Sequence, residues 1–134
     1  EPTTRPAPEV VKTAPVTASA PPVAAAPNDP GQAAELEVVR GFSARASKDR
    51  KAARTFFERA LELAPAHLGA RYEAAREAAF AKDVTVAFAH MDALVAAKGD
   101  ERARELLAQA LIEPDFARMK RDARWKLVVA AAKP

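Results

Sequence analysis

Residues 56–65 form a short amphipathic segment that ends at a proline and recurs 34 residues later in the chain. The apolar residues around it follow the three- and four-residue steps that place side chains on one face of a helix, and a proline cannot continue that helix. The positions that coincide at this shift are Ala53 with Ala87, Phe57 with Met91, Ala60 with Leu94, Leu61 with Val95, and Pro65 with Gly99. A period of this length predicts a helical repeat, and hence a binding scaffold rather than an enzyme.

The same spacing extends over most of the remaining chain and predicts an all-α fold. In the first helix we expect an apolar stripe of Leu36, Val39 and Phe42. In the last helix we expect Trp125 to face the core in phase with Val128. The predicted helices cover residues 33–46, 49–64, 68–81, 83–98, 100–112 and 122–131.

The first 32 residues differ in composition from the rest of the chain. They contain eight of the eleven prolines, together with Ala, Thr and Val, and no aromatic residue. Such a segment cannot bury enough apolar surface to offset its chain entropy, so we expect residues 1–32 to be disordered or polyproline-like. We expect the turn residues Asp29-Pro30-Gly31 to mark its boundary with one helical domain at residues 33–134. At about 3.1 Å per residue the segment spans on the order of 100 Å, which suits a tether.

The chain begins at Glu1 without a methionine, so we expect a processed or shortened chain whose preceding signal or anchor would not be visible. No run of about 18 apolar residues predicts a membrane span. The absence of cysteine excludes disulfides and Cys-ligated metal centres but leaves the redox compartment open. Because Ala/Pro/Thr spacers often follow the anchor of exported bacterial proteins, we expect the periplasm or cell envelope, with the cytoplasm as the alternative.

The helix that ends at Pro65 resembles the second helix of the tetratricopeptide repeat family. Ala53, Phe57, Ala60 and Pro65 have the family's spacing, and Gly41 stands twelve residues before Ala53, where that family places a small residue for close helix approach. Across residues 34–99 the chain is similar to two such repeats. The resemblance implies antiparallel helix pairs stacked in a short right-handed array, with partners bound in a concave groove.

The segment after the second repeat diverges from the family pattern. It reads as about half a repeat followed by a closing segment, which is similar to the end of some bacterial arrays and has Phe116 and Trp125 as its cap. Glu37 and Arg40 also depart from the pattern, since the family usually has Trp and Leu there. About two and a half repeats plus a cap is near the lower limit for a stable array, because one repeat cannot bury its apolar face alone.

By resemblance, the groove is lined by the first helix of each pair. Its residues would be Glu35, Val38, Phe42, Arg45, Tyr72, Arg76 and Phe80. An aromatic side chain beside a planar arginine suits a peptide hot spot, because it offers an apolar anchor and paired donors for a carboxylate. We expect Tyr72 and Arg76 to be exposed, whereas Phe42 and Phe80 either line the groove or pack between neighbouring helices.

One tetratricopeptide subfamily reads a chain-terminal carboxylate with Lys and Asn side chains in this groove. Here the matching positions hold Val38, Phe42, Tyr72 and Arg76, so we do not carry that activity over. The expected partner is a protein or peptide of another chemistry.

The residues offer no set of groups for catalysis or metal binding. His67 and His90 are the only histidines, and neither has a second ligand at helical spacing. The four glycines are isolated, so no loop is suited to cradle a phosphate. Helical carboxylates such as Glu73 and Glu77 lie beside arginines and are expected to form weak, solvated ion pairs. We therefore expect no enzyme activity, no metal and no cofactor.

A basic C-terminal segment supports a rival function. The formal net charge of +3 is concentrated in residues 117–134, where six cations face one acid. Nucleic acid or an anionic lipid headgroup could bind there, since cations attract phosphates and an aromatic ring can stack on a base. The residues of this patch are Arg118, Lys120, Arg121, Arg124 and Lys126. Alternatively, these cations are solvated around a core Trp125, or the array is a structural spacer that self-associates.

Overall fold

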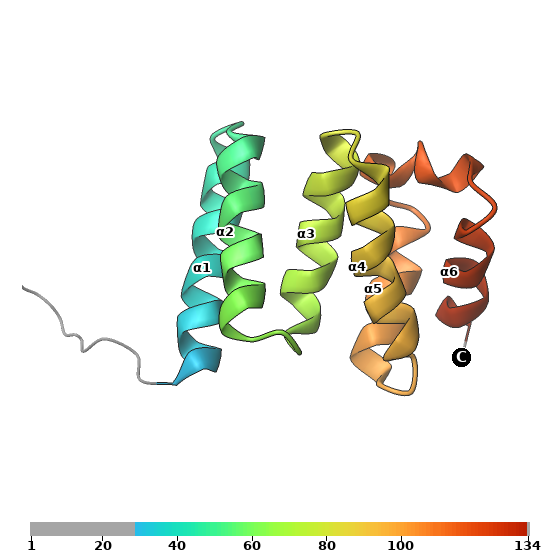
Figure 1. Ribbon diagram of the computed structural model, residues 1–134, viewed down its shortest axis with the longest axis horizontal. Helices are drawn as coiled ribbons and strands as arrows, with labels where there is room; N and C mark the ends of the chain where they lie inside the picture. Colours follow the sequence, from blue (N-terminus) through green and yellow to red (C-terminus); the bar gives the residue numbers. More distant parts are fainter. Residues whose placement is uncertain (1–28, 134) are drawn as a thin grey trace, which may run out of the picture.

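The computed structural model describes residues 29–133, and this part of the chain is helical, with no strand (Figure 1). The all-α prediction is confirmed. The helices are α1 (Pro30–Ala46), α2 (Arg50–Leu63), α3 (Leu68–Phe80), α4 (Val84–Ala96), α5 (Glu101–Ala110) and α6 (Trp125–Ala132), with two 3-10 turns, η2 (Pro114–Phe116) and η3 (Met119–Arg121). Most of the linker expected at residues 1–32 lies outside the described residues.

Consecutive helices run antiparallel, with α1 and α2 at one end of the molecule and α6 at the other (Figure 1). The closest packing joins α1 to α2 and α3 to α4, and α2 then contacts α3. α5 packs between α4 and α6, while η2 returns to α3. Residues of the C-terminal segment therefore lie against the middle of the chain. None of the helices within residues 29–133 is both long enough and apolar enough to cross a bilayer.

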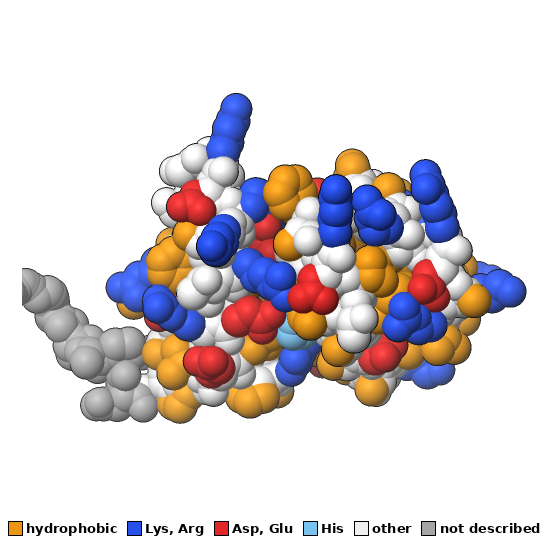
Figure 2. All heavy atoms as spheres, turned by 45° about the horizontal axis from the view of Figure 1, so that its top comes forward, with side chains coloured by type: hydrophobic (Ala, Val, Ile, Leu, Met, Phe, Trp, Pro, Cys, Tyr) orange, Lys and Arg blue, Asp and Glu red, His pale blue; other side chains and the backbone are white. Residues whose placement is uncertain are grey.

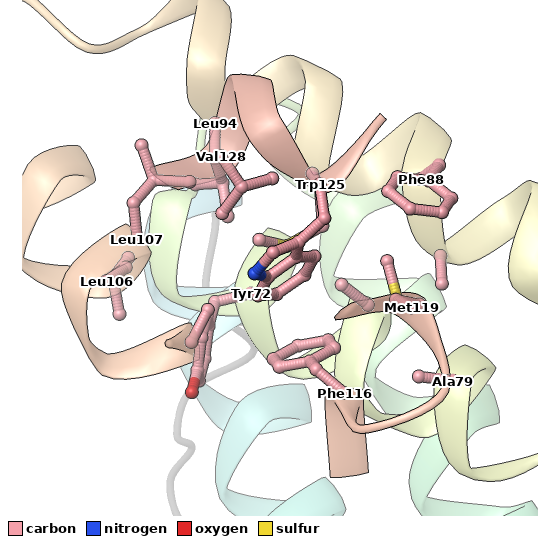
Figure 3. Close-up of a cluster of buried hydrophobic side chains, with 14 of the residues drawn as sticks. Tyr72, Ala79, Phe88, Leu94, Leu106, Leu107, Phe116, Met119, Trp125 and Val128 are labelled. Atoms are coloured by element: carbon pink, nitrogen blue, oxygen red, sulfur yellow. The ribbon is translucent and has the colours of Figure 1, made fainter. Parts of the chain in front are cut away.

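The buried side chains form two clusters. The smaller one joins α1, α2 and the start of α3 and consists of Ala34, Val38, Ala53, Phe57, Ala60, Leu61, Ala70 and Ala74. The larger one joins α3 to α6 and the two 3-10 turns, with Tyr72, Phe88, Met91, Leu107, Phe116 and Trp125 among its members (Figure 3). As predicted, Trp125 is buried in phase with Val128. Alanines occupy much of α3, so bulky side chains from both sides can approach it closely.

The first helix begins three residues earlier than predicted. Pro30 starts α1 and does not break it, because proline lacks only an N–H that would have no partner in the first turn. The carboxylate of Asp29 accepts a hydrogen bond from Gly31 N at 2.8 Å and caps the helix. The predicted boundary between linker and domain at residue 33 is therefore wrong by one helical turn.

The apolar stripe predicted for the first helix is not its buried face. Leu36, Val39 and Phe42 are 44%, 60% and 45% exposed, and the buried residues of α1 are small ones, including Gly41. An ideal Cβ on Gly41 would lie 2.5 Å from the ring of Phe57, so α1 meets α2 through a position that admits no side chain. The close approach predicted at Gly41 is confirmed, and it turns the larger side chains of α1 outwards.

Two turns related by 34 residues share their backbone geometry. Lys48 follows α1 with a φ of 66°, and Lys82 follows α3 with a φ of 67°. In each turn the next residue is an aspartate, whose N–H donates five residues back, from Asp49 to Ala44 O and from Asp83 to Ala78 O. The carboxylates of Asp49 and Asp83 then cap α2 and α4. The correspondence seen in the sequence at these residues is therefore also structural.

The later breaks differ from the sequence prediction in detail. Helix α4 ends at Ala96, and no glycine within residues 29–133 has a positive φ, so Gly99 is not a left-handed cap. Helix α6 begins at Trp125 rather than at residue 122, because residues 119–124 form η3 and a turn. The ring of Phe116 packs edge-on against Tyr72 and lies beside Trp125, with centroids 5.8 Å apart in each pair (Figure 3).

Candidate functional site

An open groove of roughly 660 Å³ lies along the first helices of the successive pairs. Its walls come from α1, from the start of α3 and from α5, and include Glu35, Val38, Phe42, His67, Leu68, Glu73, Arg102, Leu106 and Gln109. Three of the seven predicted groove residues, those on α1 other than Arg45, are among them. The ring of Phe42 is held edge-on against buried Phe57 at 5.5 Å, and its own surface is 45% exposed. The groove thus presents a fixed aromatic face with polar groups around it.

His67 positions one edge of the groove. Its Nδ1 accepts a hydrogen bond from Ala70 N at 3.0 Å and so caps α3. Because that nitrogen is an acceptor, the neutral ring carries its proton on Nε2, which donates to Glu35 at 2.7 Å. The histidine predicted to be a surface residue of the turn therefore fixes a groove carboxylate across two helices.

An arginine–carboxylate cluster lies beside the groove, where the α1–α2 turn, α3 and η2 meet. Its members are Arg45, Arg50, Arg76, Glu73, Glu77, Glu113 and Asp115. Glu77 is at its centre, with no exposed side-chain surface, and accepts from Arg45 Nε at 2.6 Å and from Arg50 Nε at 2.7 Å. Three arginines against four carboxylates leave one net negative charge.

The cluster also holds the C-terminal segment in place. Asp115 on η2 accepts from Arg50 Nη2 at 2.8 Å and from Arg76 Nη2 at 3.1 Å. Glu113 forms a further ion pair with Arg76 at 3.3 Å. The weak, solvated ion pairs predicted for Glu73 and Glu77 are therefore wrong: these carboxylates are part of a largely buried network that joins distant parts of the chain.

The predicted exposure of Tyr72 and Arg76 is wrong. Tyr72 has no exposed surface, because the alanines of α3 let Phe116 and Leu106 close over its ring (Figure 3). Its hydroxyl has no hydrogen-bond partner within the described residues, and burial raises the pKa of the phenol well above its ordinary value. The Arg76 side chain is 18% exposed, because its guanidinium is held by the carboxylates of η2.

Arg45 and Phe80 also lie away from the groove. Arg45 belongs to the arginine–carboxylate cluster, and its guanidinium packs over the ring of Phe57 at 5.1 Å. The ring of Phe80 lies under the guanidinium of Arg50 at 3.9 Å and is 52% exposed. Of the two aromatic residues left open between groove and interhelical packing, only Phe42 lines the groove.

The sequence analysis missed the contribution of α5 to this groove. Arg102 and Leu106 line it, and at the shift of 34 they correspond to Leu68 and Tyr72. The repeat period therefore held the signal that a third first helix extends the same surface.

His90 is buried rather than on an open helix face. Arg71 Nη1 can only donate, so His90 Nδ1 accepts from it at 3.2 Å, and Nε2 donates to Glu58 at 3.1 Å. The hydrogen bond from His90 lowers the pKa of Glu58. Within the part of the chain that the structure describes, no cluster of three or more His, Cys, Asp or Glu side chains is placed to hold a metal ion.

The predicted basic patch is divided into separate parts. Arg124 packs over the ring of Phe88 at 4.1 Å and pairs with Asp122, while Arg118 lies in a shallow depression near Phe80. Lys120, Arg121 and Lys126 line a different hollow, which Lys133 joins. On the face shown in Figure 2, Lys and Arg side chains spread over the whole helix array with acidic side chains between them.

The chain matches no protein-family model, no curated protein and no solved structure in comparisons with each. The argument for function therefore rests on the groove, the arginine–carboxylate cluster and the basic hollow themselves.

Proposed function

We propose that this chain is a non-catalytic interaction module, built from tetratricopeptide-like helix pairs, which binds a peptide or protein segment in the groove lined by α1, α3 and α5. The observation that carries the proposal is the half-exposed ring of Phe42 in a groove of roughly 660 Å³, ringed by hydrogen-bonding side chains. Partner recognition commonly combines an aromatic anchor with polar groups that fix the orientation of the ligand.

The helix pairing supports this assignment. Two pairs are joined by turns of equal geometry at Lys48 and Lys82, and both second helices begin with an aspartate cap. Because the groove is formed by the first helix of each pair, it follows the array and can accommodate an extended segment rather than a single small molecule.

The fixed residues around the groove favour binding without a large rearrangement. Phe42 is held by Phe57, and Glu35 is held by His67, so the two side chains lose little freedom when a ligand binds. The arginine–carboxylate cluster braces Glu73 in the same way, through Arg45 at 2.8 Å. The groove walls carry Glu35, Glu73 and Asp100 against Arg102, which favours a segment with an apolar side chain next to a basic one.

The test is a selection from a random peptide display library on the full chain, followed by affinity measurements by fluorescence anisotropy. We expect selected peptides to lose at least tenfold in affinity for Phe42→Ala and for Arg102→Glu. The matched control is Ile112→Ala, which removes an 81% exposed side chain outside the groove and should leave affinity unchanged. Peptides that bind all three variants equally, or a selection that yields no binder, would contradict the proposal.

The role of the N-terminal segment as a tether and the envelope location both stay predictions. Fractionation of cells that produce the native precursor, probed with an antibody to the helical domain, tests the location. Recovery in the cytoplasmic fraction would contradict it.

A further inference from the structure

A second site lies at the opposite end of the molecule from α1, on the C-terminal segment. Here a hollow of roughly 460 Å³ is lined by Lys120, Arg121, Asp122, Ala123, Trp125, Lys126, Val129, Ala130 and Lys133. We call it the C-terminal hollow. Within residues 29–133 none of its four cations has a carboxylate at ion-pair distance, in contrast to Arg45, Arg50 and Arg76 of the arginine–carboxylate cluster.

The single acid in this hollow is already engaged. The Asp122 carboxylate accepts from Arg124 through Nε at 3.1 Å, Nη2 at 2.9 Å and the backbone N at 2.9 Å. These bonds lower the pKa of Asp122 to about 2, so it stays ionised and paired with Arg124. Four cationic side chains are thus left facing the hollow without an internal counter-charge, which is the arrangement expected of an anion site.

The floor of the hollow is apolar. It is formed by the edge of Trp125, by half-buried Val129 and by Ala130. Trp125 is held beside Phe116 and is only 6% exposed, so the floor is fixed (Figure 3). Lys120 Nζ donates to Leu111 O at 2.8 Å, which fixes the direction of one lysine stem at the rim. The hollow therefore combines a cationic rim with a rigid apolar base.

We propose that the C-terminal hollow binds an amphiphilic anion, a molecule with a phosphate or carboxylate head and a short apolar chain. The head pairs with Lys126, Lys133 and Arg121 at the rim, and the chain lies over Trp125 and Val129. Neither part of the site suffices alone, because exposed ion pairs contribute little in water and the apolar floor is small.

The geometry argues against nucleic acid as the ligand. Base stacking on an aromatic ring requires an open face, and the 6% exposure of Trp125 leaves only an edge. The unpaired cations also surround one hollow and do not form a track along which a backbone could run.

The hollow is independent of the groove, since it shares no lining residue with it. Ligand binding here can therefore fail while the interaction function stands, and the reverse holds as well.

The test uses Trp125, the only tryptophan in the chain, as its own reporter. Octyl phosphate is titrated into the full chain below its micelle concentration while tryptophan emission is recorded. We expect a saturable change of emission. Inorganic phosphate and octanol, which each lack one half of the ligand, should bind at least tenfold more weakly. Raising the salt concentration should weaken octyl phosphate binding, because the head is held by exposed cations.

The matched variants change only the rim. Lys126→Glu with Lys133→Glu should weaken octyl phosphate binding at least tenfold, whereas Lys51→Glu, on the exposed face of α2, should leave it unchanged. Circular dichroism confirms that each variant is folded. Equal binding of octyl phosphate and inorganic phosphate, or equal binding to the double variant and the native chain, would overturn the proposal.

Two further arms identify the source of the anion. Vesicles of phosphatidylglycerol that bind the chain and are displaced by octyl phosphate would place the head in a lipid and support the proposal. Vesicle binding that octyl phosphate cannot displace would overturn it, because the contact would then be a general surface attraction. Tighter binding of a thymidine oligonucleotide than of octyl phosphate would overturn it in favour of nucleic acid.

Discussion

Arg50 on α2 donates from Nε to the Glu77 carboxylate on α3 at 2.7 Å, and Glu77 has no exposed side-chain surface. Desolvation by burial opposes the charge on Arg50, but its hydrogen bonds with Glu77 and Asp115 outweigh it and leave the pKa of Arg50 raised. A carboxylate in this position depends on its partners, because an unpaired charge in the interior is strongly unfavourable. The pair therefore makes the folded state sensitive to any change that leaves Glu77 alone or removes it.

Removing the Glu77 carboxylate should destabilise the fold. We expect Glu77→Ala to lower the free energy of unfolding by about 3–5 kcal/mol, because Arg45 and Arg50 are left without their shared partner. Urea unfolding followed by circular dichroism measures this. The control is Glu105→Ala, in an exposed pair with Arg102, which should lose less than about 1 kcal/mol. Equal losses in the two variants would show that burial of Glu77 contributes nothing, and Glu77→Gln serves as a milder variant if the alanine variant does not fold.

Adding one methyl group at Gly41 should disturb the contact between α1 and α2. A Cβ there would lie 2.5 Å from the fully buried ring of Phe57, so we expect Gly41→Ala to cost about 1–3 kcal/mol despite the better helix propensity of alanine. Thermal unfolding measures the loss. Gly99→Ala is the matched control, since nothing lies within 4 Å of its added Cβ, and its melting temperature should not fall. A stable Gly41→Ala variant would mean that α1 can move away from α2 without cost.

Glycine should stabilise the two left-handed turns. Lys48 and Lys82 have φ values of 66° and 67°, which cost a residue with a Cβ roughly 1–2 kcal/mol. Allowing for the greater chain entropy of glycine, we expect Lys48→Gly and Lys82→Gly each to raise the free energy of unfolding by about 0.5–1 kcal/mol. Lys51→Gly, within α2, should lower it by about 1 kcal/mol. Chemical denaturation distinguishes these outcomes, and a loss at both turns would argue against the shared geometry.

Three carboxylates predict a loss of stability in acid. Hydrogen bonds from His90, Arg54 and Arg124 lower the pKa values of Glu58, Asp83 and Asp122, the last to about 2. A group with a lowered folded pKa stabilises the fold above its unfolded pKa and loses that contribution as the pH falls through the folded value. The free energy of unfolding should therefore decline from about pH 4.5 towards about pH 2.

A mutant cycle assigns part of this acid loss to a single pair. Asp122→Asn and Arg124→Gln should each flatten the lower end of the pH profile, and the double variant should flatten it no further. Additive effects of the two substitutions would show that Asp122 and Arg124 act separately. Urea unfolding at a series of pH values provides the profile.

Tyr72 predicts the behaviour at the alkaline end. It is the only tyrosine in the chain, and burial raises the pKa of its phenol well above the value of about 10 expected in the unfolded chain. A group with a raised folded pKa opposes folding once the pH exceeds its unfolded value, so stability should fall above about pH 10. Tyrosinate absorbance should appear only as the protein unfolds. Tyr72→Phe should remove this loss at little cost near neutral pH, because the hydroxyl has no partner within residues 29–133.

The sequence predicts those parts of the fold that local patterns determine. The amphipathic period and Pro65 locate α2, the shift of 34 locates the matching turns, and Gly41 marks the close approach of two helices. The exposed stripe of α1 was predicted wrongly, because the choice of buried face depends on which side chains α2 presents to it.

The candidate site was harder to predict because its residues depend on contacts across the chain. Glu77 meets Arg45 across 32 residues, and Arg50 meets Asp115 across 65. Neither spacing leaves a periodic signal in the sequence, so Arg76 appeared free to bind a partner. Tyr72 appeared exposed for a similar reason, since its cover comes from Phe116 in a separate 3-10 turn.

The contact of Asp115 with Arg50 has a consequence for how the molecule unfolds. A stack of helix pairs that touch only their neighbours can fray from either end, one pair at a time. Here, loosening η2 takes a carboxylate from Arg50 and Arg76, and loosening α1 takes Arg45 from Glu77. Opening at either end thus weakens the network that restrains the other. Amide hydrogen exchange should therefore find α2 and α3 protected to the same degree, and the array should melt as one unit.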